Sequence, residues 1–274
     1  FKQKTAYEMQ RSLGGSEMCI RDRLDIRKRK GRVSVVASEV EADHFSAHVG
    51  IGHTRWATHG GVTDTNAHPH VSSCGRFIMV HNGIIENYEN MRSFLISKGY
   101  TFKSETDSEA LVNLIAYHFD ERTKDYNEDR FLEAVRKALL HVEGTYGIAV
   151  ISPLFPNEII AARKGSPLII GIGNGEHFIA SDVSGFSGRA KNVIYLEDGQ
   201  VASITKDDCD ILTIGKQQVE CVIKEIDWEM ETAELGSYKH FMEKEIFEQR
   251  KAIENAIRGR LSDDQSTAVL NGLN

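Results

Sequence analysis

The chain has 274 residues, which is enough for one large domain or two small ones with a sizeable hydrophobic core. Its 41% hydrophobic and 27% charged residues are ordinary for a globular protein, and its formal net charge of -7 argues against nucleic acid as a partner, because phosphate contacts need clustered Lys and Arg. No apolar stretch approaches the ~18 residues that a membrane-spanning helix needs, so we expect no membrane partner.

The first 23 residues do not resemble the rest of the chain. They show no helical or strand period and carry Gly14-Gly15 in the middle, so we expect residues 1–23 to be extraneous to the fold. The basic run from Arg27 to Arg32 is short, and we expect it to be a solvated segment beside a strand. The first domain is therefore expected to begin at residue 24.

The segments that follow predict two strands and then three helices. Val49 to His53 and Arg76 to His81 have the composition of strands, and the second contains an uninterrupted apolar run, as in a strand buried on both faces. Gly99 is placed as the C-cap of the first helix, and Thr106 to Glu109 have the form of a capping box that opens the second. The helices are expected over Tyr88 to Lys98, from Thr106 onward, and over Asp129 to His141.

The second half of the chain changes to a strand period, with turn residues between short apolar runs. From Tyr238 to about Arg258 the pattern is helical again. Helices grouped first and strands grouped afterwards predict an α+β fold of stacked antiparallel sheets rather than a doubly wound parallel sheet. The expected strands are Gly147–Ser152, Glu158–Arg163, Leu168–Gly173, His177–Ala180, Val193–Leu196, Gln200–Thr205 and Cys209–Thr213.

Five histidines lie between His53 and His81, which raises the possibility of a metal site. Their spacing is not the i, i+4 spacing of a helical zinc pair, and only His68 and His70 could share one strand face. We therefore expect no metal, although a metal hydrolase that uses these histidines stays an alternative at this point.

The same segment can instead hold an α-amino acid. Arg55 can offer a bidentate fork to a carboxylate, Asp107 can offer an anion to an ammonium group, and Thr58 and His59 can add hydrogen bonds. The ordinary alternatives are a surface cation beside Trp56 for Arg55, and an acidic residue favoured by the helix dipole for Asp107.

The dipeptide Asn82-Gly83 follows the buried strand and has two interpretations. Asn-Gly is a strong signal for a tight turn. It can also form an oxyanion hole, in which the Asn side-chain amide and the Gly backbone N–H point at a developing negative charge.

Taken together, these motifs resemble the glutamine:fructose-6-phosphate aminotransferase family, also called glucosamine-6-phosphate synthase. The resemblance covers about Arg27 to Asn274, and its N-terminal class II glutamine amidotransferase domain implies an Ntn-hydrolase fold, a four-layer αββα sandwich of antiparallel sheets whose first strand and helix are missing here. The matching runs are His53–Gly60, Asn66–His70, His81–Tyr88, Gly99–Phe102, Ser104–Glu109, Arg163–Leu168, Phe178–Asp182 and Tyr238–Ile246.

The resemblance implies hydrolysis of L-glutamine to glutamate and ammonia, without a cofactor. The ammonia would pass to a sugar-isomerising domain that converts fructose 6-phosphate to glucosamine 6-phosphate for amino-sugar biosynthesis. Carried over residue by residue, the implied roles are the glutamine carboxylate for Arg55, its ammonium for Asp107, a closing loop for Thr58 and His59, the ammonia exit for Trp56, and the oxyanion hole for Asn82 and Gly83, with Gly83 also touching the substrate.

The nucleophile of the family is a cysteine at the mature N-terminus, whose own α-amine acts as the base. Residues 1–23 stand where the opening segment of the family should be, so we expect the chain as written to lack the nucleophile and to be inactive. Cys19 is internal and is not followed by the glycine-rich strand of the family, so we do not expect it to be catalytic. Cys74, Cys209 and Cys221 are expected to be packing or surface residues, and the absence of a CxxC pair favours a reduced, cytoplasmic setting.

The expected organisation is an amidotransferase domain over residues 24–236 and a linker helix over 237–274 that leads toward an absent isomerase domain. The parent protein is expected to be a homodimer. Two alternatives stay open beside this interpretation, namely another class II amidotransferase, such as the one that opens purine synthesis, and a glutamine-binding domain that does not cleave its ligand.

Overall fold

The computed structural model describes residues 25–43, 47–55, 57–121, 130–186, 188–226, 238 and 241–257. The chain forms two compact units, one of them Gln3–Trp228 and the other made of Phe1–Lys2 and Glu229–Asn274. The expectations for residues 1–23, including Cys19, and for Trp56 fall outside the described residues.

The larger unit contains a six-stranded antiparallel sheet that carries the functional residues discussed below. Its strands follow the order β1-β2-β3-β4-β8-β9. Strand β2 pairs with β3 along its whole length, from Ile78 opposite Ile151 to Ile85 opposite Gly144. The bounds are β1 His70–Val71, β2 Ile78–Ile85, β3 Gly144–Ser152, β4 Phe155–Lys164, β8 Gln200–Ile204 and β9 Cys209–Thr213.

A second antiparallel sheet packs face to face on the first. Its four strands follow the order β10-β7-β5-β6. The shared core between the sheets takes Ala161 and Ala202 from the six-stranded sheet and Ile170 and Ile194 from the four-stranded one. The bounds are β5 Ile169–Ile172, β6 His177–Ala180, β7 Asn192–Tyr195 and β10 Ile223–Glu225.

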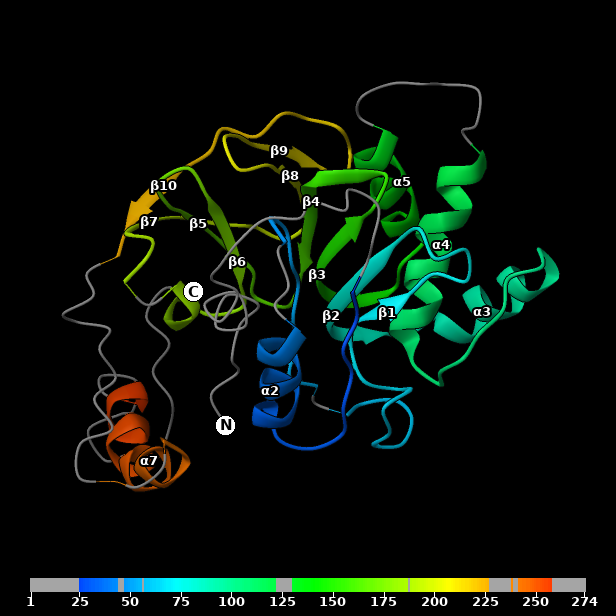
Figure 1. Cartoon of the computed structure of the whole chain (residues 1–274). Helices are drawn as coiled ribbons and strands as arrows, with labels where there is room; N and C mark the ends of the chain where they lie inside the picture. The colour runs from blue at the N-terminus through cyan, green and yellow to red at the C-terminus, as the bar shows by residue number, and fades with distance from the viewer. Residues whose placement is uncertain are drawn as a thin grey trace, which may run out of the picture. The chain divides into compact units, whose positions relative to one another are not determined.

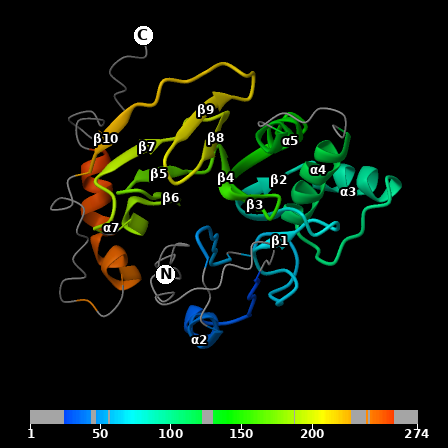
Figure 2. The same cartoon turned by 45° about the horizontal axis from the view of Figure 1, so that its top comes forward.

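Three helices cover the other face of the six-stranded sheet, as Figures 1 and 2 show. They are α3 Tyr88–Ser97, α4 Asp107–Glu121 and α5 Arg130–Leu139. Strand β4 shows how the layers form, because successive side chains of a strand point to opposite faces. Ile160 and Ala162 pack in the core under the helices, whereas Ala161 packs between the sheets. On the outer face of the four-stranded sheet, the 3-10 helix η1, Val183–Phe186, completes a smaller core.

The start of α4 is fixed by hydrogen bonds that the capping-box motif only partly predicts. The Thr106 Oγ1 accepts a hydrogen bond from the Glu109 backbone N–H at 3.3 Å, as expected for a capping box. The Glu109 carboxylate does not reach back to Thr106 but accepts from the backbone N–H groups of Lys103 and Ser104 at 2.8 and 2.6 Å. The effect is the same, since the chain entering α4 is held in place immediately before Asp107.

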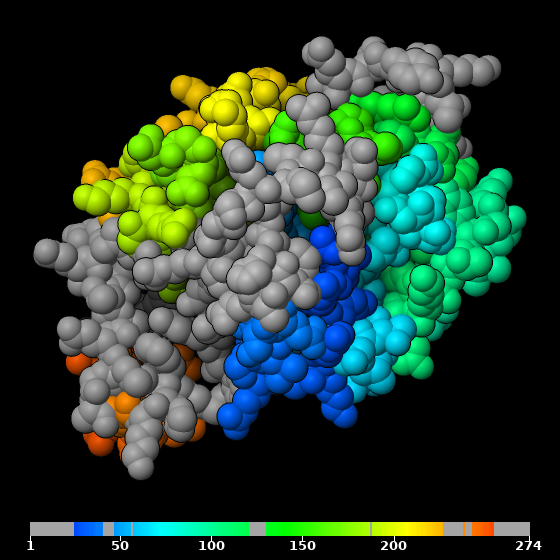
Figure 3. Space-filling view, viewed as in Figure 1, coloured from blue at the N-terminus to red at the C-terminus, as the bar shows by residue number. Residues whose placement is uncertain are grey.

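Two expectations from the sequence are wrong. Val49–His53 forms no strand among the described residues, because its backbone meets no partner strand. The basic run is followed by a helix, α2 Val33–Asp43, rather than by a strand. The valines of α2 favour a strand by local propensity, but the Arg29–Glu39 ion pair at 2.8 Å holds the basic run against the helix. Figure 3 shows α2 in blue on the surface, and Lys28, which precedes it in the chain, donates to the Thr65 carbonyl at 3.0 Å.

The smaller unit contains α7, Phe241–Ile257, which confirms the helix expected between Tyr238 and about Arg258. The Tyr238 ring stacks on Phe247 with a centroid separation of 5.8 Å. Among the described residues, no helix combines the length and the apolar character needed to cross a lipid bilayer.

Candidate active site

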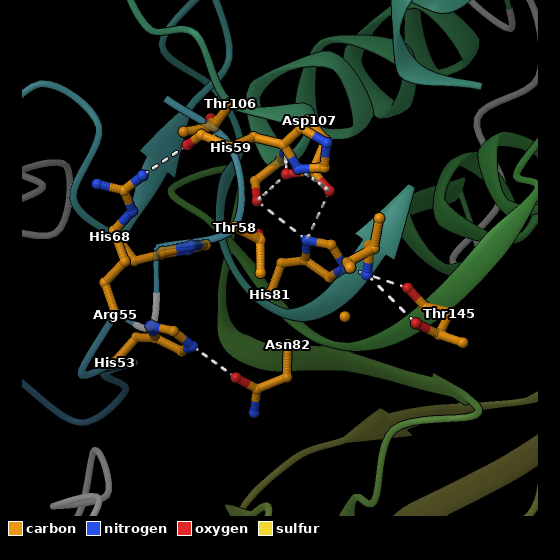
Figure 4. A pocket seen from close by; sticks show the side chains of 13 residues that line it. His53, Arg55, Thr58, His59, His68, His81, Asn82, Thr106, Asp107 and Thr145 are labelled. Carbon is orange, nitrogen blue, oxygen red and sulfur yellow. Dashed lines mark hydrogen bonds and ion pairs between the residues drawn. The ribbon is translucent and has the colours of Figure 1, made fainter. Parts of the chain in front are cut away.

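A pocket of about 310 Å³ lies where β2 approaches the start of α4. Its lining side chains come from separate segments of the chain, as Figure 4 shows. All the site residues expected from the sequence line this pocket except Trp56, which is outside the described residues. The lining residues are His53, Arg55, Thr58, His59, His68, His81, Asn82, Gly83, Ile84, Thr106, Asp107, Ser108 and Thr145.

Asn82 and Gly83 belong to strand β2 and do not form a tight turn. They lie opposite Gly147 and Tyr146 of β3 in the antiparallel register. Gly83 has a φ of +127°, and a Cβ atom at this position would collide with the Thr145 carbonyl oxygen. The position therefore requires glycine, both for its backbone angle and for the close approach of the two strands. The turn alternative is wrong, and the geometry is compatible with an oxyanion hole.

The Asn82 side chain lies within hydrogen-bond distance of a histidine. The His53 Nε2 lies 2.6 Å from the Asn82 Oδ1, as Figure 4 shows. Because the amide oxygen is engaged in this contact, the amide N–H donors of Asn82 face away from His53. Sequence reasoning placed His53 in a motif but gave it no role, since its partner lies 29 positions away in the chain.

Asp107 provides a buried carboxylate at the other end of the pocket. Its Oδ2 accepts from the Ile85 backbone N–H and its Oδ1 from the Ser108 N–H, both at 2.9 Å. The residue is 3% exposed, yet among the described residues no Lys or Arg forms an ion pair with it. The nearest imidazole nitrogens are His59 Nδ1 at 3.8 Å and His81 Nδ1 at 4.0 Å. A buried carboxylate without a full cationic partner is suited to a cationic ligand group.

The His81 ring beside Asp107 is held in one tautomer. Its Nε2 lies 3.4 Å from the Thr145 carbonyl oxygen, which can only accept, so Nε2 carries the proton. Its Nδ1 then accepts from the Ser108 hydroxyl at 3.0 Å. Burial lowers the pKa of His81, so the neutral ring does not neutralise Asp107 near pH 7.

The Arg55 guanidinium holds the loop that borders the pocket. It donates to the carbonyl oxygens of His59 at 2.6 Å, Gly60 at 3.1 Å and Gly61 at 2.8 Å. It is therefore not an isolated surface cation, although it lines the pocket as expected. Whether the guanidinium also binds a ligand carboxylate stays a prediction.

A second set of hydrogen bonds, from Asn66 and Glu105, also holds this loop, and the sequence alone did not predict it. The Asn66 Nδ2 donates to the Gly61 carbonyl at 3.0 Å and to the Glu105 Oε2 at 3.1 Å. The Gly61 N–H donates to the same Glu105 oxygen at 3.3 Å. Only the three-dimensional proximity of residues 61, 66 and 105 could reveal this role.

Three histidines form a row of ring contacts beside the pocket. The ring centroids of His53 and His68 are 4.2 Å apart, and those of His68 and His70 are 4.7 Å apart. Burial lowers the pKa of all three, that of His70 to about 3, where the nearby charges of Lys28 and Arg55 add to the effect. In the part of the chain that the structure describes, no group of three or more His, Cys, Asp or Glu side chains could hold a metal ion.

The three described cysteines lie away from the pocket. Cys74 is exposed in the connection between β1 and β2, and Cys209 and Cys221 are partly buried. Burial raises the pKa of the Cys209 thiol to about 12, which makes it a poor nucleophile.

The chain is similar to known proteins over most of its length. Residues 22–127 match the family described as a glutamine amidotransferase domain. The chain is 46% identical to the glutamine–fructose-6-phosphate aminotransferase (isomerizing) of Caldanaerobacter subterraneus subsp. tengcongensis, over 92% of this chain and 40% of that protein. It is 44% identical to the aminotransferase of the same name from Chlorobaculum tepidum, over 90% of this chain and 40% of that protein.

Among solved structures, the chain resembles the glutamine phosphoribosylpyrophosphate amidotransferase from B. subtilis. The TM-score is 0.52 at 22% identity, over 66% of this chain and 39% of that one. At this identity the likeness supports the fold alone.

The antiparallel sheets and their covering helices confirm the expected α+β fold class, and residues 22–127 match a glutamine amidotransferase domain. Over about 90% of its length, the chain is similar to glutamine–fructose-6-phosphate aminotransferases. It spans about 40% of the length of the curated relatives that it matches.

Proposed function

We propose that the chain is the glutamine-binding and ammonia-releasing part of a glucosamine-6-phosphate synthase. The observation that carries this proposal is the buried Asp107 carboxylate, which faces a pocket and has no Lys or Arg partner among the described residues. An α-ammonium group would complete it. Asn82 and Gly83, at the other end of the pocket, would receive the side-chain amide of the same molecule.

In this proposal each end of the pocket performs one task. Asp107 binds the glutamine ammonium, and Arg55 binds the carboxylate. Thr58 and His59 lie on the loop that closes over the ligand, with Trp56 beside it at the ammonia exit. Asn82 and Gly83 stabilise the negative charge that develops on the amide oxygen when glutamine is hydrolysed to glutamate and ammonia. Removal of one such donor lowers the rate on the order of 100-fold or more.

The use of the released ammonia is proposed from the names of the curated relatives. The ammonia would be used by a sugar-isomerising domain to convert fructose 6-phosphate to glucosamine 6-phosphate, in a cytoplasmic homodimeric enzyme. In this organisation residues 24–236 form the amidotransferase domain and residues 237–274 form the linker helix.

A second candidate function is a glutamine-binding domain that does not cleave its ligand. It is favoured by one observation, namely that none of the three described cysteines lines the pocket. Ammonia release from L-glutamine separates the two functions. Release above the background of a contaminating glutaminase supports the amidotransferase, and glutamine binding without release supports the binding domain.

We expect Asp107→Asn to weaken L-glutamine binding by roughly 30-fold or more, because a charge-assisted hydrogen bond contributes about 2–3 kcal/mol and each 1.4 kcal/mol is tenfold. Titration calorimetry on the full chain measures the dissociation constant. Asp120→Asn is the matched control, since Asp120 lies on the same helix and pairs with Arg76 at 2.6 Å, outside the pocket lining.

A ligand comparison sharpens this test. 4-Carbamoylbutanoate is glutamine without the α-amino group, so the unmodified chain should bind it much more weakly than glutamine. Asp107→Asn should bind the two compounds with similar affinity. If the unmodified chain does not distinguish them, Asp107 does not hold the ammonium group and the proposed binding mode is wrong.

A further inference from the structure

The amide of Asn82 can adopt two orientations that differ by a half-turn about its last side-chain bond. In one orientation the N–H donors face the pocket, and in the other the carbonyl oxygen does. Only the first orientation stabilises a developing oxyanion, because the second places a partial negative charge next to it. A neighbouring group must therefore hold the Asn82 amide in the first orientation.

His53 provides the contact that can select it. Its Nε2 lies 2.6 Å from the Asn82 Oδ1, and which of the two is the donor depends on where the His53 proton is. The Nδ1 of His53 is buried and has no hydrogen-bond partner among the described residues. A proton on Nδ1 would thus be a buried N–H group without an acceptor, which is an expensive arrangement. The proton belongs on Nε2, where Asn82 accepts it.

Neighbouring rings restrict the movement of the His53 ring. His68 packs on it with a centroid separation of 4.2 Å and an interplanar angle of 40°. His70 packs edge-on against His68, and its Nε2 lies 3.2 Å from the Thr106 Oγ1. Because Thr106 caps the helix that begins with Asp107, the row of rings connects the two ends of the pocket.

We propose that His53 is a positioning residue that fixes the orientation of the Asn82 amide by donating a hydrogen bond to its oxygen, so that the amide N–H groups face the reacting end of the pocket. This inference rests on the proposed function of the pocket. It gives His53 no contact with the substrate. Its effect is on the transition state, through Asn82, and not on ground-state binding at Asp107.

Two variants separate the hydrogen bond from the ring packing. His53→Phe keeps a ring against His68 but has no donor, whereas His53→Gln has a side-chain N–H that can reach the place of Nε2. Both are first checked for an unchanged thermal unfolding midpoint, so that a misfolded variant is not taken for a loss of positioning.

The first readout is nuclear magnetic resonance of the full chain with nitrogen-15 in histidine and asparagine. The His53 signals are assigned by their loss in His53→Gln, and the Asn82 amide signals by their loss in Asn82→Ala. We expect the His53 proton on Nε2 at neutral pH, with the two Asn82 amide protons resolved in the unmodified chain and in His53→Gln but shifted or broadened in His53→Phe. A His53 proton on Nδ1, or Asn82 signals that His53→Phe leaves unchanged, overturns the proposal.

The second readout is kinetic and is made on the same variants when the chain releases ammonia. We expect His53→Phe to lower kcat about 10- to 100-fold, up to the effect of losing one oxyanion donor, with KM for glutamine within about twofold. His53→Gln should restore most of this loss. A rise in KM with kcat unchanged would place His53 in ligand binding and contradict the positioning role.

These results are separable from the proposed function itself. If the unmodified chain fails to bind glutamine in calorimetry, the proposed function fails, whatever the resonances show. If it binds glutamine and His53→Phe leaves the Asn82 amide unaffected, only the role of His53 fails.

Discussion

Gly83→Ala is expected to destabilise the larger unit by roughly 3–5 kcal/mol and to abolish glutamine binding, the largest effect of any single change in the pocket. Two penalties combine at this position. The φ of +127° is strained for alanine, and the added Cβ would collide with the Thr145 carbonyl oxygen of the paired strand. The unfolding free energy in urea and the dissociation constant for glutamine measure the two consequences.

Gly31→Ala is the matched control for the backbone angle. Gly31 has a φ of +123° but no atom within 4 Å of the added Cβ. Its cost should be roughly 1–3 kcal/mol at most, since only the strain is present. Equal losses of stability in the two variants would show that the collision with β3 contributes nothing.

Acidification below about pH 6.5 is expected to unfold the larger unit steeply. Burial lowers the pKa of His53, His68, His70 and His81 in the folded chain, that of His70 to about 3. In the unfolded chain these histidines have their usual pKa values, so below about pH 6.5 the unfolded chain binds more protons than the folded chain. Stability is fully present above the unfolded pKa and is lost as the pH falls toward the lower folded values.

Each such histidine contributes up to about 1.4 kcal/mol per pH unit in this window, so the four together can remove several kcal/mol between about pH 6.5 and 5. The unfolding free energy measured in urea at a series of pH values gives the slope. His68→Phe removes one titrating ring and should reduce the slope by about 1.4 kcal/mol per unit. An unchanged slope in this variant would mean that His68 is not held neutral in the folded chain.

Much of the fold was readable from the sequence because its elements follow strong local patterns. Helix α3 ends where Gly99 takes a φ of +89°, and β6 and β9 have the bounds that the turn residues predicted. The predictions that were wrong concern structure that depends on contacts between residues distant in sequence. A strand exists only if another strand pairs with it, and Val49–His53 has none among the described residues.

The site shows the same division. Arg55 and Asp107 could be proposed from charge and geometry, because few residue types can hold an amino acid. The sequence could not predict that Asn82-Gly83 lies within a strand, because pairing with β3 overrides the local preference for a turn. The roles of Glu105 and His53 depend on partners 44 and 29 residues away, so no local pattern marks them.

The pairing of β2 has a consequence for the length of the ligand. The Ile85 N–H anchors Asp107, and Asn82 stands three residues earlier on the same strand. At about 3.3 Å per residue, the covalent chain spaces these two positions by roughly 10 Å. Strand β2 therefore sets the spacing between the proposed ammonium end and the proposed amide end. We expect asparagine, which is one methylene shorter than glutamine, not to reach both ends at once. An insertion or deletion between positions 82 and 85 would change this spacing, and we expect it to change which length of amino acid the pocket accepts.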